Sequence, residues 1–288
     1  MGVVESSRGE GELNLHDLVI KAEESRDVLP FDPETEITEQ EKGNIMQDLK
    51  DRIGKKEWNI AFPRARMIKS LFPEKKIELA LNKEDWQKIC DDRKRIIKFS
   101  EADNNSAQVV ASEAVDLWAL FPEKSEDFAF AFDEEAWQKM EARLEELRRL
   151  VKDGHTGSFA DLAMNMAILF PDRTSELNLD EEIWQALNVY IIDEPTGKDV
   201  YISACALRKI LFPERTKSMK FEPEAWMSMK ETLHKCSPQN SNFLRQAYFL
   251  KVIAAKEVRI VNHRLEVTMP SQDKFREKEI PLPERRKF

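Results

Sequence analysis

The sequence contains little glycine, little cysteine and no long apolar run. Only 8 of its 288 residues are glycine, which leaves little material for the glycine-rich loops that hold phosphates. The three cysteines, Cys90, Cys205 and Cys236, are odd in number and widely spaced, which argues against a disulfide framework and a CxxC metal site. No run of 18 or more apolar residues occurs, and the N-terminus lacks the apolar core of a signal peptide. We therefore expect a cytoplasmic protein that has no contact with a membrane.

The charge balance disfavours one class of partner. Charged residues make up 34 % of the chain and hydrophobic residues 41 %, which is typical of a helix-rich protein with a polar surface. The formal net charge of -9 makes sequence-independent binding to a phosphate backbone less favourable, because such binding requires a basic face. Two local basic clusters, Arg93-Lys94-Arg95 with Lys98 and the C-terminal Arg285-Arg286-Lys287, keep RNA as an alternative partner.

A Leu-Phe-Pro motif followed by an acidic residue occurs four times, at steps of 49, 49 and 42 residues. A tryptophan follows each motif leucine after 15, 17, 15 and 15 residues, and a small residue precedes each leucine by six. The repeated positions are Ala65, Leu71, Pro73 and Trp86; Ala114, Leu120, Pro122 and Trp137; Ala163, Leu169, Pro171 and Trp184; and Cys205, Leu211, Pro213 and Trp226. Such self-similarity predicts a repeat architecture.

Each repeat is expected to contain two helices. The segment Ser158 to Phe170 places apolar residues three and four positions apart, which predicts an amphipathic helix that ends at the following proline. Asn82, Asp133 and Asp180 each lie four residues before a tryptophan and are typical N-caps of a second helix. The small residues allow close helix approach. We expect the tryptophans to pack in the core, although base-stacking platforms are the alternative interpretation.

We predict an all-α fold of tandem helix-turn-helix repeats, either α-solenoid-like or a compact array, with a small C-terminal β-hairpin. Alternating residues around Asn262-His263 predict the hairpin strands Glu257 to Val261 and Arg264 to Thr268. The connections between the two helices of a repeat, such as 128–132, are expected to be extended. The predicted boundaries are a disordered leader at 1–13, a degenerate N-terminal repeat or cap at 14–58, a repeat array at 59–268, and a flexible charged tail at 270–288. Within the array the copies are expected at about 59–100, 104–152, 156–193, 197–236 and, altered, 241–268.

The Leu-Phe-Pro-Glu motifs, the acidic N-caps and the tryptophans resemble those of uncharacterised helical-repeat proteins from bacteria of the candidate phyla radiation. The resemblance covers roughly residues 60 to 268. It implies a helical-repeat fold and brings no assigned activity.

Residue patterns for catalysis are missing from the sequence. It contains no GxxxxGK[ST], GxGxxG, HExxH or GxSxG motif and no zinc-ligand spacing. The histidines lie in separate segments, and we interpret them as exposed residues of turns and helix ends. We therefore assign no catalytic, cofactor-binding or metal-binding residue, and we expect no enzyme activity.

The leading functional hypothesis is a scaffold that binds another protein through the curved face of the array. Trp58 and Trp118 lie outside the repeated tryptophan position and are the candidates for exposed binding anchors. An RNA- or ribosome-associated protein and an unrecognised enzyme are the two alternatives. The oligomeric state is left open by the sequence.

Overall fold

The computed structural model describes residues 30–79, 81–99, 105–131, 133–153, 155–192, 198–217, 221 and 223–270. The predicted leader at 1–13 and all of the predicted tail except Pro270 lie outside these residues, so both stay predictions.

The described chain is mostly helical and ends in a two-stranded antiparallel hairpin, as expected. The helices are α2 (Pro33–Glu36), α3 (Glu39–Gly54), α4 (Trp58–Leu71), α5 (Lys83–Phe99), α6 (Asn105–Leu120), α7 (Glu134–Arg149), α8 (Thr156–Leu169), α9 (Glu181–Ile192), α10 (Lys198–Leu211), α11 (Pro213–Thr216), α12 (Pro223–His234) and α13 (Ser241–Ala254). Short 3-10 helices are η3 (Pro122–Ala131), η4 (Val151–Asp153) and η5 (Pro171–Leu177), and the strands are β1 (Glu257–Val261) and β2 (Arg264–Thr268).

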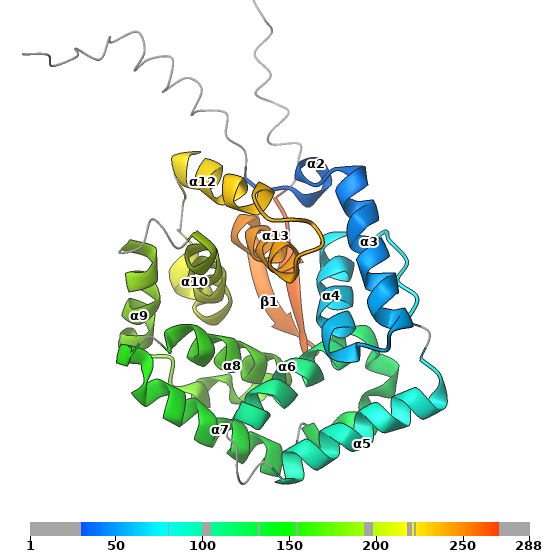
Figure 1. The fold of residues 1–288 in the computed structure, drawn as a ribbon. Helices are drawn as coiled ribbons and strands as arrows, with labels where there is room; N and C mark the ends of the chain where they lie inside the picture. Colours follow the sequence, from blue (N-terminus) through cyan, green and yellow to red (C-terminus); the bar gives the residue numbers. More distant parts are fainter. Residues whose placement is uncertain are drawn as a thin grey trace, which may run out of the picture.

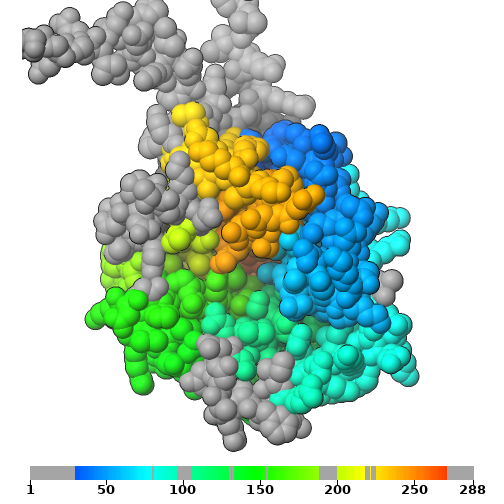
Figure 2. All heavy atoms as spheres, in the orientation of Figure 1, coloured from blue at the N-terminus to red at the C-terminus, as the bar shows by residue number. Residues whose placement is uncertain are grey.

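Five helices form a closed inner ring. α4 packs against α6, α6 against α8, α8 against α10 and α10 against α13, and α13 returns to pack against α4. The helices α3, α5, α7, α9 and α12 lie outside this ring (Figure 1). Atoms of α13 fill the space between α12 and the α3–α4 pair on the face shown in Figure 2. The five inner helices therefore pack against one another in a closed ring.

The motif residues determine where the inner helices end. α4, α6, α8 and α10 all end at the leucine of a Leu-Phe-Pro motif. The phenylalanine that follows leaves the helical region, with φ of -128° at Phe72 and Phe170 and -127° at Phe212, because proline disfavours helical geometry in the residue before it. The small residues Ala65, Ala114, Ala163 and Cys205 are all buried, as close helix packing requires.

The N-caps of three outer helices are confirmed. The side-chain oxygens of Asn82, Asp133 and Asp180 accept hydrogen bonds from backbone N–H groups three residues later, at 2.8, 2.8 and 3.1 Å. The expected extended connection at 128–132 is wrong, because Phe128 to Ala131 belong to η3. Proline at the start of η3 and η5 presets a helical φ, which favours a short turn over a strand.

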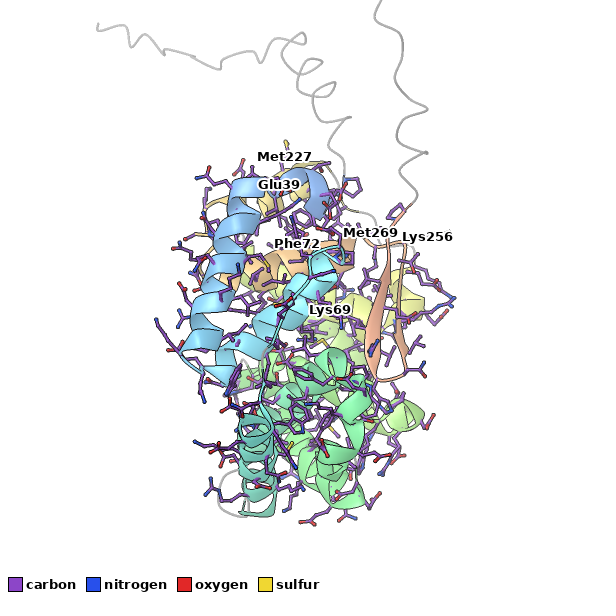
Figure 3. All side chains as sticks on the ribbon, turned by 90° about the vertical axis from the view of Figure 1, so that its right-hand side faces the viewer. Glu39, Lys69, Phe72, Met227, Lys256 and Met269 are labelled. Atoms are coloured by element: carbon purple, nitrogen blue, oxygen red, sulfur yellow. The ribbon has the colours of Figure 1, made fainter. Side chains whose placement is uncertain are left out.

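The hairpin lies across the ring end at which the inner helices terminate. Asn262 and His263 have φ of 47° and 58°, which gives the tight turn that matches strand twist. The register pairs Val258 with Val267 and Val261 with Arg264. β1 contacts α8 and α10, and β2 contacts α6. We call this part of the molecule the hairpin end, and in Figure 3 Lys69, Lys256 and Met269 mark it.

Candidate functional site

The repeated tryptophans pack in the protein interior. Each of the first three meets the phenylalanine of the next motif edge to face. The ring centroids are 5.2 Å apart for Trp86 and Phe121, 5.0 Å for Trp137 and Phe170, and 5.3 Å for Trp184 and Phe212. Trp226 contacts Phe221 instead, at 5.6 Å. Trp86, Trp137 and Trp226 are buried and Trp184 is half-buried, so these rings contribute packing energy rather than a ligand platform.

In the first three of these contacts, a basic residue three positions after the phenylalanine lies over the tryptophan ring. Lys124 lies 4.3 Å from the Trp86 ring centre, Arg173 lies 3.9 Å from Trp137 and Arg215 lies 5.2 Å from Trp184. Arg173 and Arg215 also pair with the first residue of the outer helix, Glu134 at 2.8 Å and Glu181 at 2.7 Å. The same three-part contact therefore recurs between successive motifs.

The N-terminal segment has a related arrangement without a tryptophan. Lys42 lies four residues after the N-cap Thr38, which is the position that Trp137 occupies after Asp133. The Lys42 ammonium lies 5.3 Å from the ring centre of Phe72 and pairs with Glu39 at 2.8 Å. Glu39, the first residue of α3, also pairs with Lys75, three positions after Phe72, at 3.4 Å. A buried lysine here takes the place of the aromatic ring.

The two proposed anchors, Trp58 and Trp118, are both half-buried. Trp58 stacks on Phe62 with ring centres 5.6 Å apart. The indole N–H of Trp118 donates to the Asn262 carbonyl at 3.2 Å, and its ring lies 4.3 Å from that of His263. Trp118 therefore holds the tip of the hairpin against the ring.

Lysines near the ends of three inner helices cap the neighbouring inner helix. Each lies two residues before the motif leucine or its counterpart Ile253. Lys69 of α4 donates to the Ala119 carbonyl of α6 at 3.3 Å, and Lys251 of α13 donates to the Ser70 carbonyl of α4. Lys209 of α10 donates to the Ile253 carbonyl of α13 at 2.7 Å and also to the Ala255 carbonyl. A cation at a helix C-terminus satisfies free carbonyls and interacts favourably with the helix dipole.

At the junction between α6 and α8, a residue of the hairpin lies at the end of α8 where three of the other junctions have a lysine. Trp118 stands at the position that lysine occupies in α4, α10 and α13. His263 Nδ1 lies 3.1 Å from the Ile168 carbonyl of α8, next to Trp118. The expectation that His263 is an exposed turn residue is therefore wrong, because His263 is half-buried between two inner helices.

The junction between α8 and α10 differs from the other four. The corresponding residue of α8 is Ala167, whose methyl group cannot reach a carbonyl. Among the described residues, no side chain donates to the Ile210 carbonyl of α10. Ala167 and Ile210 instead line a groove of about 870 Å³, which is within the roughly 300–1,000 Å³ of ligand sites. We call this the open junction, and the other four the capped junctions.

Strand β1 forms one wall of this groove. All six residues from Lys256 to Val261 line it, together with Leu211, Pro213 and Leu265. A strand that offers one face contributes alternate residues, so six consecutive residues indicate that the strand borders the groove with its edge. A two-residue turn makes Val261 and Arg264 a hydrogen-bonded pair, so the N–H and C=O groups of Val258 and Ile260 point away from β2. Among the described residues no strand pairs with this edge of β1, so the groove lies beside an unpaired strand edge.

Four basic and two acidic residues line the groove. Both acids are already paired, Glu214 with Lys217 at 2.5 Å and Glu257 with Arg259 at 2.6 Å. Among the described residues no carboxylate lies within 4.0 Å of the Lys209 or Lys256 ammonium group. Burial lowers the pKa of Lys209 to about 8. The groove therefore carries an excess of positive charge in a chain of net charge -9.

A second group of charged residues joins the inner helices. Arg66 of α4 pairs with Asp116 of α6 at 2.5 Å, and burial raises the pKa of the fully buried Asp116 to about 6 against the attraction of Arg66. Arg245 of α13 pairs with Asp161 of α8 at 3.0 Å, so this bond crosses the ring between helices that are not ring neighbours. None of these four residues lines the groove, and their arrangement fits a structural role.

The cysteines and the basic cluster noted in the sequence do not come together in one site. Cys90 and Cys205 are buried, and Cys236 lies 3.8 Å from the Gln246 side-chain oxygen. Within the described ranges no group of three or more His, Cys, Asp or Glu side chains could hold a metal ion. In the basic cluster, Arg93 pairs with Glu113 and Arg95 with Asp92. No helix in the described part of the chain is both long and apolar enough to cross a bilayer.

Comparisons with protein-family models, curated proteins and solved structures gave no match to this chain.

Proposed function

We propose that this chain is a cytoplasmic, non-catalytic scaffold of helical repeats that binds a partner protein, and that an extended segment of the partner lies beside β1 in the groove. The observation that carries the proposal is the unpaired edge of β1, which borders a groove along its whole length. Extended peptides bind such edges by adding a strand, because backbone hydrogen bonds supply affinity and neighbouring pockets receive alternate side chains.

The recurring contacts support a repeat origin for the ring. Three successive motifs share the tryptophan, phenylalanine and cation arrangement. α13 also carries a lysine two residues before Ile253, as α10 does before Leu211. In a closed ring the inner helices pack against one another, so the ends of these helices are accessible to a partner and their inner faces are not. This moves the expected binding surface from the curved face of a solenoid to the hairpin end.

The other two hypotheses have less support. RNA binding would use basic side chains free to contact phosphates, whereas Arg93 and Arg95 face carboxylates. An enzyme would place convergent titratable groups in a cavity, whereas Asp116 and Asp161 do not line the groove. The groove beside β1 therefore favours protein binding.

The cross-strand pair Val258 and Val267 offers a matched test. Val258→Pro removes an N–H group that points away from β2 into the groove, whereas Val267→Pro makes the same change on the opposite edge. Random peptides displayed on phage would be selected on the full-length chain, and a selected peptide would be measured against both variants by calorimetry. We expect Val258→Pro to weaken binding by about tenfold or more and Val267→Pro to change it little.

Two results would contradict the proposal. One is a failure to select any peptide that binds the full-length chain, and the other is equal weakening by the two substitutions. Sedimentation of the chain provides a further check. A dimer that Val258→Pro dissociates would make a second copy of the chain the occupant of the groove.

A further inference from the structure

The charges of the groove indicate which segment it would accept. This inference rests on the proposed function. Glu214 and Glu257 already have partners, and no carboxylate of the described residues pairs with Lys209 or Lys256, so a bound segment would meet these two ammonium groups. Lys209 is half-buried, and an ammonium group removed from water is stabilised by a carboxylate placed near it.

The two lysines lie at different depths in the groove. Lys209 belongs to α10 at the base, where it already donates to the carbonyls of Ile253 and Ala255. An ammonium group has three N–H bonds, so among the described residues one donor of Lys209 remains for a ligand. Lys256 directly precedes β1, and Figure 3 shows it on the side of the molecule that carries the hairpin. A segment that pairs with β1 passes close to both positions.

The Ile210 carbonyl disfavours an anionic ligand. It would attract a cation, because it lies near the C-terminal end of α10 without a side-chain donor among the described residues. A helix C-terminus carries only about half of a negative charge, whereas the two lysines supply two full positive charges. The balance therefore favours an anionic ligand, and a backbone N–H of the same segment can serve the Ile210 carbonyl.

We infer that the groove is a binding site for an extended acidic peptide segment of a partner protein, paired with the edge of β1 and held through carboxylate contacts to Lys209 and Lys256. Apolar side chains of the segment would face Leu211, Val258 and Ile260. The chemical class of the ligand is thus an extended segment that carries both carboxylate and apolar side chains.

Peptide selection on the full-length chain tests this class directly. Phage-displayed random peptides should yield sequences enriched in Asp and Glu. One selected peptide, and a version with Gln and Asn in place of its acids, would then be measured by calorimetry. We expect the neutral version to bind about tenfold or more weakly.

Charge reversal on the protein provides the matched comparison. Lys256→Glu should weaken the acidic peptide by about tenfold or more. Lys50→Glu gives the same change of net charge on α3, at an exposed lysine that does not line the groove, and should have little effect. Lys209→Met provides a second variant at the base, with its folding checked by circular dichroism.

The possible failures are distinguishable. Selected peptides without an acidic excess, bound equally by Lys256→Glu and lost in Val258→Pro, would overturn the acidic class and leave strand addition intact. Peptides whose binding is indifferent to Val258→Pro would overturn the proposed function itself. Selection that succeeds only on a variant lacking residues 271–288 would identify the chain's own C-terminal segment as the occupant, and would overturn the partner assignment.

Discussion

The α13–α4 junction and the α8–α10 junction have similar helix packing and different ends. At the first, Lys251 reaches from α13 to the Ser70 carbonyl of α4. At the second, Ala167 stands in the corresponding position and a groove of about 870 Å³ lies beside it. The two junctions therefore differ in whether a side-chain donor reaches the end of the neighbouring helix, and the proposed binding site lies at the junction where no described side chain does so.

The first and largest expected effect is the removal of a cap. Lys251→Met keeps much of the apolar volume and removes the donor to the Ser70 carbonyl. We expect the free energy of unfolding to fall by about 2 kcal/mol, since hydrogen bonds from charged groups contribute about 1.5–3 kcal/mol. Lys256→Met, at a lysine without an ion pair among the described residues, should change it by less than about 0.5 kcal/mol. Equal effects in urea unfolding would contradict the role of the cap.

The second effect is a change in the free energy of unfolding with pH, which arises from Lys209. Burial lowers the pKa of Lys209 from 10.5 to about 8 in the folded chain. Between these values the unfolded chain binds more protons, so this group adds stability as the pH rises from about 8 to about 10.5. After allowance for partial exposure, we expect the wild-type chain to gain roughly 1.5 kcal/mol relative to Lys209→Met. A constant or falling difference in urea unfolding over this range would show that burial does not oppose the ammonium group.

The third effect concerns closure of the open junction. Ala167→Lys places a donor where α4, α10 and α13 already have one, and we expect it to stabilise the chain by about 1 kcal/mol and to block peptide binding. Ala167→Met fills similar space without the charge, so it should block binding without the same gain in stability. Unchanged peptide binding in both variants would place the ligand elsewhere.

The sequence predicted the local structure because the signals are local. Pro73, two residues after Leu71, ends α4, and Asp133 begins α7 with a hydrogen bond over three residues. The hairpin appears at the predicted residues because Asn262-His263 can adopt positive φ. These features depend on neighbours within a few positions of the chain.

Ring closure and the groove could not be predicted in the same way. Closure depends on α13 meeting α4, with Lys251 and Ser70 181 residues apart. Trp118 was expected to be an exposed binding anchor. Its contact with Asn262 could not be foreseen, because the two residues lie 144 positions apart in the chain. One signal was available in the sequence: the position two residues before the motif leucine contains Lys, Trp, Ala and Lys in successive copies. Its meaning becomes clear only when the helix ends are brought together.

Hydrogen exchange of the hairpin amides, with and without a selected peptide, tests the central claim most directly. The account predicts slower exchange at Val258 and Ile260, whose N–H groups would pair with the added strand, and unchanged exchange at Val267 on the opposite edge. Peptide binding that leaves Val258 and Ile260 unprotected would contradict the assignment of the open junction as the binding site.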